Sequence, residues 1–251
     1  MDKIRISAVR YANTYPFIYG LTESGFDKSA VIETDHPSVC AEKMISGRAD
    51  LGLIPVGAMP EVKQPVVVSD YCIGADGKVR TVQMMSNSHL EDVTRIYLDY
   101  RSRTSVRLIK VIAGNFWNRN FEWRTTDEMF DFGVTEKNAA VVLIGDQCFT
   151  YESRYLYRWD LAEVWKMNTG LPFVFACWVA NKALPDLFVS EFNNALARGV
   201  MNLDMVVERF RNTGPINGEK LREYLSRNID FILDNQKRRA MDLFLDLVKK
   251  L

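Results

Sequence analysis

Two patterns divide the chain: strand-like and helical segments alternate over its first two thirds, and helical segments alone fill its last third. The strand candidates are short runs rich in apolar and β-branched residues, at residues 4–9, 30–33, 50–54, 66–69, 95–98 and 139–144. The helix candidates lie at residues 15–21, 38–46, 105–113 and 127–132. Strands that alternate with short helices are typical of an α/β fold, in which helices cover open sheets.

The last third, residues 185–251, has helical periodicity almost throughout, and we expect no strand there to complete a second sheet. Helices with no sheet of their own must pack on an earlier part of the chain. We therefore predict that the chain leaves a first α/β lobe, builds a second one, and returns to the first. A single doubly wound domain with a helical tail would give a similar pattern.

Two extended segments suit the crossings between the lobes, residues 79–85 on the way out and residues 173–181 on the way back. These crossings assign residues 1–80 and 181–251 to the first lobe and residues 81–180 to the second, inserted lobe. Paired crossings form a hinge, and the groove between two lobes is a common place for a small ligand. The expected architecture is therefore two α/β lobes with a cleft between them and the C-terminal helices packed on the first lobe.

The charge balance argues against several kinds of partner. The 32 basic and 32 acidic residues cancel, so the chain lacks the basic surplus that duplex DNA or an anionic membrane would require, and a small molecule is the expected partner. No stretch of about 18 apolar residues suggests a membrane span. The N-terminus enters a strand pattern with no export signal, so a cytoplasmic location is expected.

A metal centre is not expected. The four cysteines lie far apart in the sequence and form no CxxC pair, and only His36 and His89 could supply an imidazole. Both histidines lie in polar loop contexts, where a structural or solvent-exposed role is expected. The dinucleotide, P-loop, hydrolase-elbow and zinc-protease motifs are also missing from the sequence.

Two segments combine the end of a strand with the start of a helix. The first, residues 11–17, offers Asn13 or Thr14 as the helix cap, and the second offers Ser102 or Thr104. Unpaired amides and partial positive charge at a helix start can hold a carboxylate or a phosphate. Each segment could also be a capped helix with no ligand, but two such starts, one in each lobe, would suit a compact dianion.

Charged residues near these strand ends are further candidates. Arg101 and Arg103 lie in the second segment, and guanidinium groups are suited to carboxylates. Asp146 follows Gly145 at the end of a buried strand, and open α/β sheets bind ligands at such ends. Asp146 could orient a substrate hydroxyl or hold a lobe-closing hydrogen bond, although an aspartate that caps a turn is equally common.

Five segments within residues 4–181 form a specific combination: YANTYPF (residues 11–17), DLGLIPV (50–56), DYRSRTS (99–105), IGD (144–146) and TGLPFVFA (169–176). In this order and spacing they resemble the chorismate dehydratases of menaquinone biosynthesis by the futalosine pathway. The resemblance implies the type 2 periplasmic-binding-protein fold, which agrees with the two lobes predicted above.

The resemblance also implies a reaction. Members of this family eliminate water from chorismate, removing a ring proton and the neighbouring hydroxyl, to give 3-[(1-carboxyvinyl)oxy]benzoate. The ring becomes aromatic, which drives the reaction, so no metal, nicotinamide or flavin cofactor is expected. In one reading of the family, the enolpyruvyl carboxylate of the substrate is the base.

The resemblance assigns roles to individual residues. Asn13 and Thr81 are the implied catalytic residues; Thr81 replaces a serine that is usual in the family, so the hydroxyl is kept while the extra methyl narrows the site. Helix-start amides near Thr14 would hold one carboxylate, and the hydroxyl cluster at residues 102–105 would take the other. The predicted substrate-binding residues are Thr14, Ser38, Ser102, Arg103, Thr104, Ser105, Gly145 and Asp146.

Two more departures and two alternatives bear on the substrate. Ala12 and Tyr15 stand where leucines are usual in the family, which changes the size of the pocket near Asn13.

One alternative is an enzyme like the dihydroxynaphthoate synthase of the same pathway and fold, which acts on a later cyclic substrate. The other is a solute-binding protein that holds a small anion without changing it.

Overall fold

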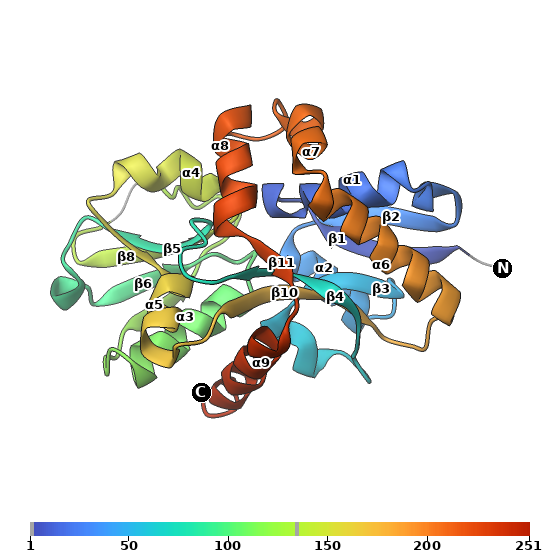
Figure 1. Cartoon of the computed structure of the whole chain (residues 1–251). Helices are drawn as coiled ribbons and strands as arrows, with labels where there is room; N and C mark the ends of the chain where they lie inside the picture. The colour runs from blue at the N-terminus through green and yellow to red at the C-terminus, as the bar shows by residue number, and fades with distance from the viewer. Residues whose placement is uncertain (1–2, 134–135) are drawn as a thin grey trace.

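The two predicted lobes are present in the computed structural model, which describes residues 3–133 and 136–251. They lie side by side, and the long strands β4 (Val66–Ala75) and β10 (Phe173–Ala180) run toward their junction (Figure 1). Helices α8 (Gly218–Glu223) and α9 (Asn235–Val248) lie on opposite sides of this junction in the same view. The C-terminal part of the chain is therefore placed at the boundary between the lobes.

The first lobe is built on a six-stranded sheet. Besides β4 and β10 it contains β1 (Ile4–Val9), β2 (Ala30–Asp35), β3 (Leu51–Pro55) and β11 (Asp230–Ile232). The strand order is β11-β4-β10-β3-β1-β2; β1 pairs in parallel with β2 and β3, and β10 is antiparallel to both of its neighbours. Every residue of β3 and β10 is buried, as expected for central strands covered on both faces.

The second lobe is built on a five-stranded sheet. Its strands are β5 (Val82–Ser86), β6 (Arg95–Leu98), β7 (Glu122–Thr125), β8 (Ala139–Ile144) and β9 (Tyr157–Asp160). Their order is β7-β6-β8-β5-β9, with β8 at the centre and buried along its whole length. Parallel pairing joins β6 to β7 and β8, whereas β5 is antiparallel to β8 and β9. The carboxyl ends of β6 and β8 therefore meet at one edge of this sheet.

Helices complete both lobes. On the first lobe they are α1 (Tyr15–Glu23), α2 (Pro37–Ile45), α6 (Asp186–Met201) and α7 (Leu203–Phe210), with 3-10 turns η1 (Ala12–Thr14), η2 (Phe26–Lys28) and η3 (Val56–Glu61). On the second they are α3 (Thr104–Asn115), α4 (Gln147–Tyr151) and α5 (Leu161–Thr169), with η4 (Leu90–Asp92) and η5 (Glu152–Arg154). The π-helical turn η6 (Tyr224–Asn228) continues α8.

Helices α1 and α6 pack unusually closely, and two glycines make this possible. A Cβ atom on Gly20 would lie 1.9 Å from the carbonyl oxygen of Ala195, and one on Gly199 would lie 1.7 Å from that of Pro16. Neither position can carry a side chain without separating the helices. The close pair holds the start of α1, which follows β1, in a fixed place at the junction of the lobes.

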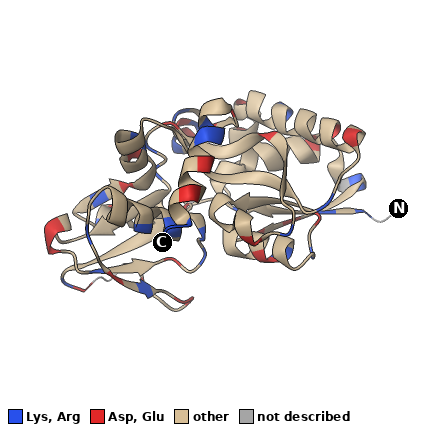
Figure 2. Cartoon of the chain, turned by 90° about the horizontal axis from the view of Figure 1, so that it is seen from below, with Lys and Arg blue, Asp and Glu red and all other residues tan. Residues whose placement is uncertain are grey.

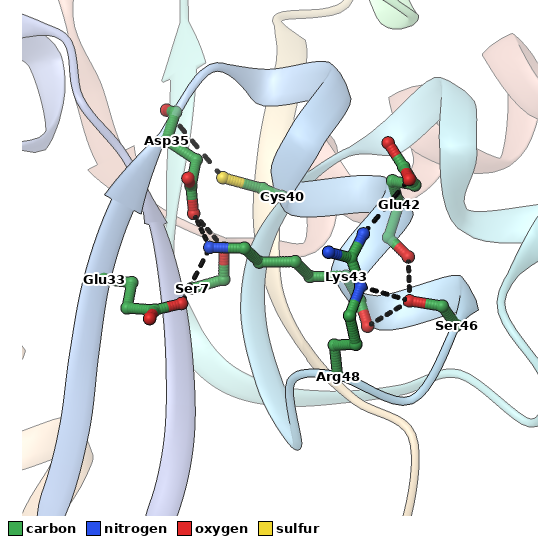
Figure 3. Close-up of polar contacts among 8 residues, drawn as sticks. All are labelled: Ser7, Glu33, Asp35, Cys40, Glu42, Lys43, Ser46 and Arg48. Atoms are coloured by element: carbon green, nitrogen blue, oxygen red, sulfur yellow. Dashed lines mark hydrogen bonds and ion pairs between the residues drawn. The ribbon is translucent and has the colours of Figure 1, made fainter.

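A polar cluster fixes α2 against the edge strand β2 (Figure 3). The Lys43 ammonium lies 2.5 Å from the carboxylate of Asp35 and 2.7 Å from that of Glu33, and the Ser7 hydroxyl donates to Asp35 at 3.2 Å. The Lys43 side chain is only 15% exposed, so water screens these pairs less than it would on an open surface. The cluster therefore ties the last turn of α2 to β2 and, through Asp35, to Ser7 of β1.

The C-terminal helices contact both lobes. Helix α6 packs on α1 in the first lobe, as predicted, whereas α9 packs against β10 and η3 and also against α3 of the second lobe. Lys237 of α9 is 1% exposed, and its ammonium pairs with Asp230 at 2.5 Å and Asp234 at 3.2 Å. A buried ammonium requires such partners, so this group ties α9 to β11.

The structure corrects two elements of the sequence analysis. Residues 127–132 form turns instead of the expected helix: the Asp127 carboxylate accepts from the Met129 amide and that of Asp131 from the Gly133 amide. Such side-chain bonds compete with helical hydrogen bonds. The helical pattern expected after residue 185 is also interrupted by a short strand, β11, which adds to the edge of the first sheet, beside β4, and not to the second sheet.

The strand ladders also bear on the lobe boundaries. The predicted second lobe, residues 81–180, includes β10, but β10 pairs with β3 and β4 in the first sheet. We therefore propose that the inserted lobe ends before Phe173, with the crossings at about residues 76–81 and 170–172. The outward crossing is irregular and leads directly into β5, which belongs to the second sheet.

Charged residues of both signs lie along each lobe (Figure 2). This distribution agrees with the formal net charge of +0. Among the residues described, none of the helices has both the length and the apolar composition that a bilayer crossing needs.

Candidate active site between the lobes

A cleft lies where the two lobes meet; about 500 Å³ of it is not filled by atoms, and this space includes open solvent. Both lobes and the outward crossing contribute to it. The polar side chains on its walls are Tyr11, Asn13, Thr81, Ser102, Thr104 and Ser105. The described residues that line it include no Asp, Glu, Lys, Arg or His, so an anion in the cleft would be held by hydroxyls, a carboxamide and backbone amides.

Asn13 reaches the cleft because η1 turns the chain immediately after β1. The Thr14 hydroxyl donates to Asn13 Oδ1 at 3.2 Å, which holds the carboxamide in one orientation. Thr14 itself is fully buried and does not line the cleft. The structure thus brings Asn13 to the predicted site and places Thr14 behind it, where its hydroxyl supports the carboxamide.

Thr81 lies on the outward crossing, and its side chain is 1% exposed. Its Oγ1 is 2.7 Å from the hydroxyl oxygen of Tyr224, the first residue of η6. Burial raises the pKa of Tyr224 well above its usual value of 10, so this phenol stays protonated at neutral pH. Sequence reasoning missed Tyr224, because it lies 143 residues beyond Thr81 in a helical segment that gave no local motif.

The start of α3 forms a second polar wall. The Ser102 hydroxyl accepts from the Ser105 amide at 3.0 Å and so caps the helix. The Thr104 hydroxyl donates to the Phe175 carbonyl and accepts from the Gly57 amide, both at 3.0 Å. All three hydroxyl residues of this cluster line the cleft, but Thr104 is occupied in joining α3 to the first lobe.

Arg103 and Ser38 lie off the walls of the cleft. The Arg103 guanidinium pairs with Glu61 at 2.6 Å, and Arg107 joins the same carboxylate at 2.8 Å. The Ser38 amide donates to the Arg101 carbonyl at 3.1 Å, which links the two lobes through their backbones. Both predicted substrate-binding residues therefore contribute contacts between the lobes in this structure.

Gly145 and Asp146 close one end of the cleft. Gly145 lines it, adopts φ +68°, and lies so close to the Tyr11 ring that a Cβ atom would be 2.7 Å from it. The Asp146 carboxylate accepts from the Ala12 amide, at 3.1 and 3.2 Å, instead of facing the cleft. Burial raises the pKa of Asp146 to about 6. Of the two roles expected for Asp146, the structure shows the lobe-joining one.

His36 lies next to the cleft, behind the Tyr11 side chain. Its Nδ1 is 3.3 Å from the Tyr11 hydroxyl, and Arg10 contacts its other ring nitrogen. Burial, followed by the charge of Arg10, lowers the pKa of His36, so the ring is neutral at pH 7. Among the described residues, no group of three or more His, Cys, Asp or Glu side chains gathers as metal ligands do.

Two α/β lobes with this strand order and a cleft between them are the architecture of the periplasmic binding proteins. Solved structures with this fold include a Candida albicans protein described as having the generic periplasmic-binding-protein fold, with TM-score 0.68, 10% identity and 100% and 91% of the two chains covered. The periplasmic aliphatic sulphonate binding protein of Escherichia coli gives TM-score 0.59, 12% identity and 98% and 92% coverage. A protein of Archaeoglobus fulgidus gives TM-score 0.76, 14% identity and 99% and 97% coverage.

Within this class, the chain belongs to the menaquinone biosynthesis family, whose sequence pattern it matches over residues 4–250. The match extends beyond the motifs of the first 181 residues and includes the C-terminal helices. The chorismate dehydratase of Thermus thermophilus is 23% identical, with 94% of this chain and 92% of that protein aligned.

Proposed function

We propose that this protein is a chorismate dehydratase of the futalosine route to menaquinone. The observation that carries the proposal is that Asn13 and Thr81, far apart in sequence, lie on the walls of one cleft together with the start of α3. Membership of the menaquinone biosynthesis family and the similarity to a chorismate dehydratase support it. Chorismate carries two carboxylates, which suits a cleft between two lobes that offers neutral hydrogen-bond donors.

In the proposed reaction, a ring C–H bond and the C–O bond of the neighbouring hydroxyl both break. The C–H electrons become part of the aromatic ring, a base takes the ring proton, and that proton then passes to the departing hydroxide, which leaves as water. Negative charge grows on the departing oxygen as the C–O bond lengthens. Hydrogen bonds from Asn13 and Thr81 would stabilise it there, and a preorganised donor in a cleft that excludes water lowers a barrier by about 3 kcal/mol.

The residues that line the cleft also indicate which group takes the ring proton of the substrate. None of them is a carboxylate or an imidazole, so the wall offers no conventional group to take the ring proton. This supports a carboxylate of the substrate as the base. The amides at the start of α3 and the hydroxyls of Ser102 and Ser105 would hold the other carboxylate, since the first amides of a helix have no intrahelical acceptor.

Mass spectrometry of the product tests the proposal. Purified protein is mixed with chorismate, and we expect a product lighter than chorismate by one molecule of water, together with a change in ultraviolet absorbance as the ring becomes aromatic. Chorismate recovered unchanged would contradict the proposal. Tight binding of unchanged chorismate, measured by calorimetry, would indicate a solute-binding protein instead.

A further inference from the structure

Tyr224 contacts the cleft residues without lining the cleft itself. It begins the π-helical turn η6, and its side chain is 1% exposed. Its ring packs edge-on against Phe149 of α4, with centroids 5.3 Å apart, and its hydroxyl oxygen lies 2.7 Å from Thr81 Oγ1. Irregular π-helical turns are frequent at functional sites. Here the turn brings a hydroxyl from the C-terminal helices to a residue of the crossing between the lobes.

The hydrogen bond of the Tyr224 hydroxyl among the described residues is the one to Thr81 Oγ1, at 2.7 Å. Its two ends differ in their surroundings, because the phenol is buried whereas Thr81 lines the cleft. A buried hydroxyl has to donate to a partner inside the protein, while a hydroxyl on the wall of a cleft can also donate to a group bound there.

The phenol hydrogen of Tyr224 needs an acceptor inside the protein. Burial keeps the phenol protonated, and Thr81 Oγ1 is the acceptor within reach among the described residues. Since Tyr224 donates to this oxygen, the hydroxyl hydrogen of Thr81 is not used in the bond between them. Thr81 lines the cleft, so its hydrogen is available to a group bound there.

We infer that Tyr224 is a positioning residue that makes Thr81 a hydrogen-bond donor toward the cleft. The hydrogen bonds run from the Tyr224 hydroxyl to Thr81 Oγ1 and from the Thr81 hydroxyl to a group bound in the cleft. No proton is transferred along them; each group keeps its hydrogen and fixes the orientation of the next. The inference rests on the proposed function, in which Thr81 donates to the departing hydroxyl of the substrate.

The variant Tyr224→Phe tests this role. It removes one hydroxyl and keeps the ring packing on Phe149, so the variant is expected to fold, which thermal melting checks. We expect kcat for chorismate dehydration to fall about tenfold, the effect of losing one oriented hydrogen bond, with KM within about twofold of wild type. The matched control is Tyr155→Phe, which removes another buried hydroxyl, one that donates to the Phe132 carbonyl in the second lobe. This control should keep the wild-type kcat.

A double-variant cycle separates positioning from a structural role. Thr81→Val removes the hydroxyl through which Tyr224 acts, so adding Tyr224→Phe to it should change kcat by less than about twofold. If the kcat losses of the two single variants multiply in the double variant, or if Tyr224→Phe keeps wild-type kcat, the inference is overturned while the proposed function remains. A wild-type protein that does not convert chorismate would overturn both.

Discussion

The carboxylate of Asp146, in the second lobe, accepts hydrogen bonds from the backbone amide of Ala12, in the first, at 3.1 and 3.2 Å. Ala12 directly precedes Asn13, so the bond that joins the lobes also fixes the turn that carries a proposed catalytic residue. The contact that joins the lobes here therefore also holds the backbone next to Asn13.

The same pair predicts a pH dependence of stability. Burial raises the pKa of Asp146 to about 6, so the folded protein binds this proton more tightly than the unfolded chain, in which an aspartate has pKa about 4. The contribution of Asp146 to stability therefore declines as the pH rises from about 4 to 6. Asp146→Asn has no carboxyl group at this position and so does not show this decline. The free energy of unfolding of the variant, minus that of wild type, should therefore rise as the pH increases from about 4 to 6.

Urea denaturation at several pH values from 4 to 7 measures this difference. Asp160, whose pKa is also raised to about 6, titrates in both proteins, so it cancels in the comparison. A free-energy difference between the two proteins that does not change with pH, or one that moves the other way, would show that Asp146 is not the buried proton-binding group described here.

Asp160 joins the start of α5 to the outward crossing. Its carboxylate accepts from the amides of Ala162 and Glu163, as a helix cap, and from those of Val79 and Arg80 on the crossing. Asp160→Ala should lower the free energy of unfolding by about 3 kcal/mol, since four amides, two of them buried and two partly buried, lose their acceptor.

An ordinary helix cap is the control for Asp160. Asn217 accepts from the Lys220 amide at the start of α8 and has no second role of this kind. Asn217→Ala should cost about 1 kcal/mol. Chemical denaturation compares the two variants, and equal losses would mean that the bonds of Asp160 to the crossing contribute nothing.

Much of the fold was predictable because short-range patterns determine it. The bounds of β1, β6 and β8 agree with the predicted strands, and α3 begins one residue before its predicted start. Apolar and β-branched periodicity is enough for such elements. The turns at residues 127–132 were not predictable in this way, because side-chain bonds of two aspartates decide them.

The candidate site was predictable only in part, since its motifs indicate the chain segment and not the direction of each side chain. Asn13, Thr81, Ser102, Thr104 and Ser105 lie on the walls of the cleft, and their roles toward a substrate stay predictions. Periodicity carries no information on long-range pairing, however. The bond of Arg103 to Glu61 and that of Thr81 to Tyr224 join residues 42 and 143 positions apart.

Arg103 gives a prediction that separates cleft residues from lobe contacts. Its guanidinium is bound to Glu61 and does not line the cleft, so Arg103→Met should change kcat/KM for chorismate by less than about fivefold, the size of a partly exposed ion pair. Steady-state kinetics checks this. A rise in KM of two orders of magnitude with unchanged kcat would mean instead that Arg103 leaves Glu61 and binds a substrate carboxylate.

The central claim is that Asn13 acts on the substrate in the cleft between the lobes, and its most direct test is the turnover of chorismate by Asn13→Ala. The control, Asn168→Ala, makes the same chemical change on the exposed face of α5. With both variants folded, as shown by circular dichroism and melting temperature, we predict that kcat of Asn13→Ala falls by about a hundredfold or more, while the control keeps wild-type kcat. Turnover by Asn13→Ala equal to that of wild type would contradict the account.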